Sequence, residues 1–155
     1  MRSIIVLFAT TLLACEPHAD SPAAPSTGNA LEWMSCGPTD GAALSIIVSA
    51  ETLACADPNY PKVSSIDRYE LEVYTGSPET GKPIALNGNM GRARSCPAQG
   101  DCHDLPDATI TFEGPSGEPN APVGTTAGTV RFTEGGNKVV RAFRAETCIV
   151  HQMCG

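Results

Sequence analysis

The chain has 155 residues, and its 10 Lys and Arg against 17 Asp and Glu give a formal net charge of −7. This length predicts one domain. The 15 glycines and 13 prolines make up about 18% of the chain, which is below the roughly 25–30% that indicates disorder. The acidic balance argues against a nucleic-acid-binding protein, because such a protein needs a basic face to neutralise phosphates.

The N-terminus carries the pattern of an export signal. Arg2 is followed by an apolar run over residues 4–9 and by a further stretch to residue 14. A charged start and a short apolar stretch are typical of a secretory signal peptide, and the run is too short to span ~30 Å of hydrocarbon. Residues 1–14 are therefore predicted to be a signal peptide.

The end of this stretch, Leu12-Leu13-Ala14-Cys15, resembles the lipobox of bacterial lipoproteins. The resemblance implies cleavage after Ala14 and a thioether-linked diacylglycerol on Cys15, with palmitate-type acyl chains anchoring the protein in a membrane. In enterobacterial lipoproteins an Asp after the lipidated cysteine favours inner-membrane retention, so Glu16 favours the outer membrane. We therefore expect a lipid-anchored protein of the bacterial cell envelope.

Residues 15–35 are expected to be the lipidated cysteine and a flexible tether. Segment 16–30 holds three prolines and many small residues without apolar periodicity, which is typical of a semi-extended linker. Leu31 and Trp33 mark the point where packing begins. A single β-sandwich-like domain is predicted for residues 36–155.

The apolar pattern of this domain has a period of two. Residues 44–48, 69–74, 107–113 and 129–133 alternate between apolar and polar, and shorter candidates lie at 84–86 and 89–95. The segments between them are rich in Pro, Gly, Asn and Asp, which favour turns. These features predict an all-β fold, either an antiparallel β-sandwich or an open barrel, stapled by disulfides.

A hairpin is predicted near the C-terminus, because Gly135-Gly136 separates residues 129–133 from an extended run at 138–147. In this run Arg141 shares a face with Val139 and Phe143. A charge on the inward face is typical of an edge strand. We therefore expect residues 138–147 to lie at an edge of the sheet.

Six cysteines remain after Cys15, and an even number in an exported chain predicts three disulfides. Six cysteines allow 15 pairings. The turn-rich spacer between Cys96 and Cys102 favours a local pair there, and Cys148 and Cys154 have the same separation. Because the core is lean in aromatic residues, we also expect at least one long-range bridge from Cys36 or Cys55 to Cys148 or Cys154.

Two cysteine–histidine segments offer an alternative as metal ligands. His103 follows Cys102, and His151 lies between Cys148 and Cys154, a donor set that zinc or copper accepts. Neither segment has the paired C-x2-C spacing of a structural zinc site, and exported thiols tend to oxidise. No metal site is therefore predicted at these cysteines.

An acidic loop is the other candidate for a metal. Asp101, Asp104 and Asp107 have oxygen ligands suited to Ca²⁺, but the register of an EF-hand loop is missing. Solvated turn residues are the preferred interpretation. No cofactor is expected.

Enzyme motifs give little support for catalysis. The sequence has no G-x-S-x-G, H-E-x-x-H, P-loop or C-x-x-C pattern. The preferred hypothesis is a non-catalytic binding or structural module with an envelope protein or glycan as partner. The alternatives are a small hydrolase that uses loop carboxylates and a metal-binding protein.

Two further segments resemble small cysteine-rich lipoproteins of myxobacteria. They are Cys36-Gly37-Pro38-Thr39-Asp40-Gly41 and the terminal Cys154-Gly155. The resemblance covers scattered positions and implies no activity. The enzyme and the binding module are separated by whether polar loop residues converge in a concave pocket with perturbed acidities. A flat, acidic surface would favour the binding module.

Overall fold

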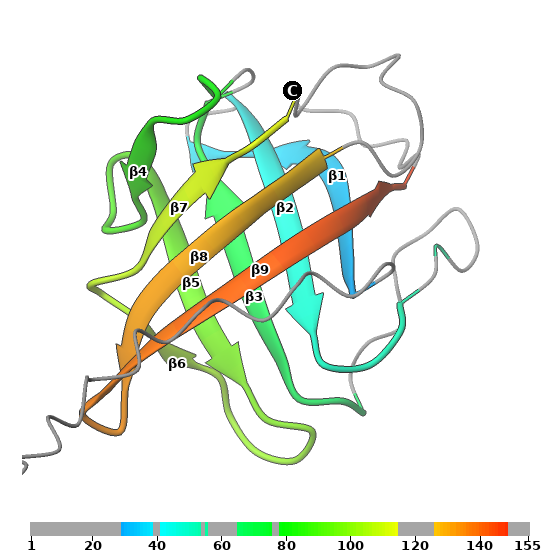
Figure 1. Ribbon diagram of the computed structural model, residues 1–155, viewed down its shortest axis with the longest axis vertical. Helices are drawn as coiled ribbons and strands as arrows, with labels where there is room; N and C mark the ends of the chain where they lie inside the picture. The colour runs from blue at the N-terminus through cyan, green and yellow to red at the C-terminus, as the bar shows by residue number, and fades with distance from the viewer. Residues whose placement is uncertain are drawn as a thin grey trace, which may run out of the picture.

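Nine β-strands make up the regular structure of the computed structural model, which describes residues 29–38, 41–53, 55, 65–75, 78–114 and 126–148 (Figure 1). The strands are β1 (Ala30–Cys36), β2 (Ala42–Ser49), β3 (Arg68–Val73), β4 (Pro83–Ala85), β5 (Gly91–Cys96), β6 (His103–Asp104), β7 (Thr109–Phe112), β8 (Thr126–Glu134) and β9 (Asn137–Thr147). The described part of the chain contains no helix that is long and apolar enough to cross a membrane.

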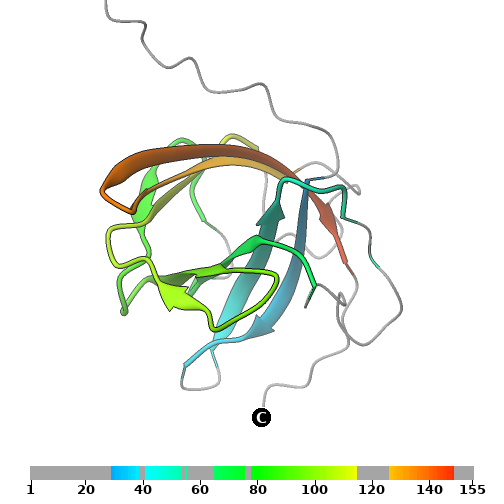
Figure 2. The same ribbon diagram turned by 90° about the horizontal axis from the view of Figure 1, so that it is seen from below.

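All nine strands belong to one sheet in the order β4-β7-β8-β9-β1-β2-β3-β5-β6. Every neighbouring pair is antiparallel except β1 and β9, which run parallel, so the sheet is mixed. Figure 2 shows the sheet curled on itself, with β8 and β9 forming a wall that faces β3 and β5. The predicted all-β, disulfide-stapled fold is confirmed, in its open-barrel form.

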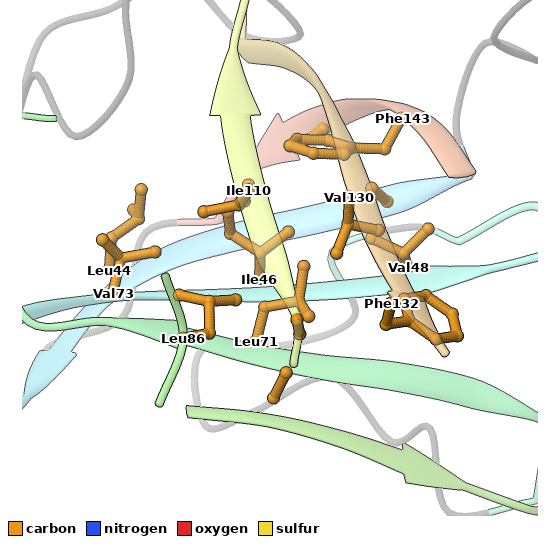
Figure 3. Packing of buried hydrophobic residues seen from close by; sticks show 14 of the residues in the cluster. Leu44, Ile46, Val48, Leu71, Val73, Leu86, Ile110, Val130, Phe132 and Phe143 are labelled. Carbon is orange, nitrogen blue, oxygen red and sulfur yellow. The ribbon is translucent and has the colours of Figure 1, made fainter. Parts of the chain in front are cut away.

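The inner face of the curled sheet holds the main core. Alternate residues of β2, β3, β7, β8 and β9 point inward and are buried, as the period-two pattern requires. Figure 3 shows these side chains meeting between the two walls. Phe112 and Phe143 form an edge-to-face pair with ring centroids 6.3 Å apart. A Cβ on Gly128 would lie 2.8 Å from the Phe143 ring, so this position has room only for glycine.

The predicted C-terminal hairpin is confirmed. Gly135 and Gly136 have φ angles of 56° and 80°, which lie in the left-handed region that glycine adopts without strain. These two residues connect β8 to β9, whose registry runs from Glu134 opposite Asn137 to Thr126 opposite Ala145.

The sheet begins at Ala30, within the segment 15–35 that was expected to be a tether. β1 lies between β9 and β2, and residues 30–33 are buried. Both faces of this strand are covered: Ala30 belongs to the main core, while Leu31 and Trp33 pack in a second cluster with Leu53 and Cys148. A strand buried on both faces lacks the alternation by which the other strands were recognised.

The expectation that residues 138–147 form an edge strand is wrong, because β9 lies between β8 and β1. β1 covers only the last three residues of β9, Ala145–Thr147. The inward-facing Arg141 lies before this paired section, at the open end of the barrel, where its guanidinium remains exposed. The charge therefore marks the end of the barrel rather than the edge of the sheet.

Two disulfides join described residues, one long-range and one local. Cys55 bonds Cys148 across 93 residues, and Cys96 bonds Cys102 across six. These are a long-range bridge of the expected kind and the local pair that the spacing favoured. Cys36 is also disulfide-bonded. Cys15 and Cys154 lie outside the described residues.

Candidate binding groove at the open end of the barrel

A groove of about 660 Å³ lies at the open end of the half-barrel. It separates β9 from the ends of β2, β3 and β5, and we call it the mouth groove. The residues that matter most for its chemistry are Asn29, Tyr69, His103, Glu134, Val140 and Arg141.

Tyr69 and Glu134 connect the two walls across this groove. The Tyr69 hydroxyl donates a hydrogen bond of 3.1 Å to Oε2 of Glu134, the last residue of β8. The Tyr69 ring packs against Phe132 with centroids 4.7 Å apart. On the other carboxylate oxygen, Oε1, Nε2 of His103 approaches to 3.6 Å. One carboxylate thus contacts groups from both β3 and β6.

The Tyr69 hydroxyl is held in its protonated form. Burial raises the pKa of this hydroxyl above its usual value of 10.0, and the charge and hydrogen bond of Glu134 raise it further, while Arg141 opposes the shift. At neutral pH Tyr69 is therefore a neutral hydrogen-bonding group rather than a nucleophile.

Arg141 supplies positive charge to the groove without a carboxylate of its own. In the described part of the chain, no acidic side chain forms an ion pair with this residue. The arginines on the outer face of β3 and β5 differ, because Arg92 pairs with Asp104 and Arg94 pairs with Glu70. Arg141 also hydrogen-bonds the Tyr69 side chain. Because a guanidinium has five N–H donors, it is still suited to a carboxylate or another polar acceptor of a ligand.

Asn29 closes one end of the groove by bonding to the backbone of β9. Its Nδ2 donates to the carbonyl of Ala142 at 3.3 Å, and its Oδ1 accepts from the amide of Arg144 at 3.2 Å. The Asn29 side-chain amide thus makes the two hydrogen bonds to β9 that the peptide group of a neighbouring strand would make. At the opposite rim, Oδ1 of Asp67 accepts a hydrogen bond of 2.7 Å from the amide of Ala98.

Glu32 is a buried acid that lies outside the groove. Its Oε1 accepts hydrogen bonds from the hydroxyls of Thr126 at 2.5 Å and Thr147 at 2.8 Å, and its exposed fraction is 1%. Oε2 is buried and has no hydrogen-bond partner among the described residues. Because these contacts join β1 to β8 and β9, Glu32 is a structural connection rather than part of the groove.

The cysteine–histidine pairs do not form a metal site in the described part of the chain. Cys102 and Cys148 are both in disulfides, and His151 lies outside the described residues. The one close group of metal-binding residue types there is Glu70, Cys96 and Cys102. The two sulfur atoms of that group are bonded to each other, so it has no thiolate to offer a metal.

The three aspartates of the acidic loop also have separate roles. Asp104 pairs with Arg92, Asp107 accepts a hydrogen bond from the amide of Thr133, and Asp101 is exposed. The hydrogen bonds from Thr133 lower the pKa of Asp107 below its usual value. No cluster of these carboxylates forms among the described residues.

Sequence reasoning missed the groove itself. Tyr69 begins a predicted strand and Glu134 precedes the predicted Gly135-Gly136 turn, so neither position carries a local signal of a site. The inward parity of Arg141 was the available signal. It indicated a charge on the core face of the strand. It did not show that β9 and β3 line the same groove, because that depends on how the sheet curls.

Comparisons with protein-family models, curated protein sequences and solved structures find no match to this chain.

Proposed function

We propose that the chain is a lipid-anchored, non-catalytic binding module of the bacterial envelope, and that its ligand binds in the mouth groove. The lipobox-like Leu12-Leu13-Ala14-Cys15 supports the anchor and, with Glu16, the outer membrane. The observation that carries the binding role is the groove, whose volume of about 660 Å³ falls within the ~300–1,000 Å³ typical of ligand sites.

The chemistry of the groove favours recognition over catalysis. Tyr69 stays protonated, and Glu134 is already engaged by Tyr69 and His103. Arg141 offers donors, and Val140, 40% exposed, offers an apolar surface beside them. A glycan or peptide with a carboxylate or several hydroxyls would match this combination.

Soluble peptidoglycan fragments are a suitable first probe because they contain both sugars and acidic peptides. In an NMR titration of the mature chain we expect shifts confined to residues of the groove. Arg141→Ala should weaken binding at least about tenfold, the effect of losing a charge-assisted hydrogen bond. The matched variant Arg92→Ala removes an arginine on the outer face and should have no effect. Shifts spread evenly over the surface would argue against this site.

The anchor is tested separately by Cys15→Ala. We expect the wild-type protein to be extracted from membranes as a lipid-modified chain that begins at Cys15. The variant should lack the modification and accumulate uncleaved or mislocalised. If both proteins partition into membranes equally after signal removal, the lipid anchor is wrong and the groove must be interpreted without it.

A further inference from the structure

The mouth groove runs along a strand edge that no described strand covers. β9 spans 11 residues, but β1 pairs only with Ala145–Thr147. The Asn29 amide bonds Ala142 and Arg144. The part of β9 before these residues pairs with β8 on one side only. Its other side lines the groove through Val140, Arg141 and Ala142.

The parallel pairing of β1 and β9 specifies which residues would continue this ladder. Ala30 lies opposite Ala145 and Glu32 opposite Thr147, a constant offset of 115 residues. Because the strands are parallel, residues that precede β1 would lie beside residues earlier in β9. In that register the chain segment 23–27 lies opposite residues 138–142.

The directions in which the β1 carbonyl groups point show which residues of an extended segment would face β9. The carbonyl of Glu32 accepts from the amide of Cys148, while the carbonyl of Asn29 accepts from the amide of Ser49. Even-numbered residues therefore direct their backbone toward β9, and odd-numbered ones direct theirs toward β2. Pro25 is odd, so its missing N–H would not be required by β9.

The composition of the segment agrees with this placement. Residues 23–27 carry no Lys or Arg that would repel Arg141 of the groove, and their side chains are small. Gly28, next to the Asn29 amide, has no side chain to obstruct it. A covalently attached segment also has a high effective concentration at a nearby surface, in the millimolar range for short linkers.

We propose that residues 23–27 of the tether bind in the mouth groove as an added strand on β9, in the register set by β1. The Asn29 amide takes the two bonds due to residue 28, so the main-chain pairing starts at Ser26. The amide of Ser26 donates to the carbonyl of Val140, and the carbonyl of Ser26 accepts from the amide of Ala142. The tether is then a built-in occupant that a groove ligand displaces. This inference concerns the same groove in which the proposed function places the ligand.

Hydrogen exchange of residues 15–155, produced without the signal peptide and carrying Cys15→Ala, tests the proposal without any ligand. The amides of Val140 and Ala142 should exchange at least about fivefold more slowly than in a variant whose residues 16–27 are replaced by a Gly/Ser sequence of equal length. The amides of Arg141 and Phe143 face β8 and serve as internal references.

Two proline variants test the register. Ser26→Pro removes the proposed donor and should remove the slow exchange of Ala142. Thr27→Pro changes an odd position and should retain it. Equal exchange in the wild-type and Gly/Ser chains, or equal loss in both proline variants, would overturn the added strand. Either result would leave ligand binding in the groove unaffected, so the two proposals fail separately.

Discussion

The hydroxyl of Tyr69 and the carboxylate of Glu134 are 65 residues apart in the chain and meet at 3.1 Å across the open end of the barrel. The Tyr69 ring also packs against Phe132 of β8. This pair therefore links β3 to the end of β8 beside the mouth groove.

Tyr69→Phe should lower the free energy of unfolding by about 1 kcal/mol, the usual net value of one hydrogen bond. The Phe ring retains the contact with Phe132, so the change isolates the hydroxyl. Urea denaturation of both proteins measures the difference. Tyr74→Phe is the matched control, since its hydroxyl donates to Glu72 only two residues away and should contribute less. A larger loss in the control would contradict this role for Tyr69.

Stability should also depend on pH through Tyr69. The pKa of its hydroxyl is raised in the folded protein by burial and by Glu134, so the folded state retains the proton longer than the unfolded chain. This contribution is complete below pH 10 and is lost as the pH rises through the folded pKa. Tyr69→Phe should reduce the alkaline loss of stability, as measured by urea midpoints between neutral and alkaline pH. An unchanged alkaline slope would argue against a raised pKa at Tyr69.

Glu32→Ala should destabilise the fold by about 2–5 kcal/mol, because it creates a cavity and removes the carboxylate that accepts hydrogen bonds from the hydroxyls of Thr126 and Thr147. Glu32→Gln keeps an oxygen acceptor and should retain more of the stability. Thermal and urea unfolding compare the three proteins. An alanine variant as stable as wild type would show that these contacts contribute little.

Removing the long-range disulfide should cost more than removing the local one. Closing the 93-residue separation of Cys55 and Cys148 is worth roughly 4–5 kcal/mol in the loop-entropy treatment, against ~2 kcal/mol for the six-residue separation of Cys96 and Cys102. The double variants Cys55→Ala/Cys148→Ala and Cys96→Ala/Cys102→Ala test this order by urea unfolding. The reverse order would mean that native-state packing, rather than chain entropy, dominates.

Local patterns predicted most of the strands. β3, β7 and β8 each have one mainly buried face that the period-two alternation reveals. β2 is buried on both faces, but Ser45 and Ser49 still alternate with its larger apolar residues. β1 was missed because Ala30 and Leu31 are buried on opposite faces of the sheet. The position of β9 could not be predicted either, because its pairing with β1 joins Ala30 to Ala145 across almost the whole domain. The groove depends on that long-range pairing and on sheet curvature, neither of which leaves a local signal.

The central claim is that the mouth groove binds an envelope ligand, and photocrosslinking in living cells tests it most directly. A benzophenone amino acid at Ala50, an exposed residue of the groove, is compared with one at Ala85 on β4, which is exposed outside it. We expect an adduct heavier than the chain from position 50 alone, reduced by Arg141→Ala. Identical adducts from both positions, or none from position 50, would contradict the groove as a binding site.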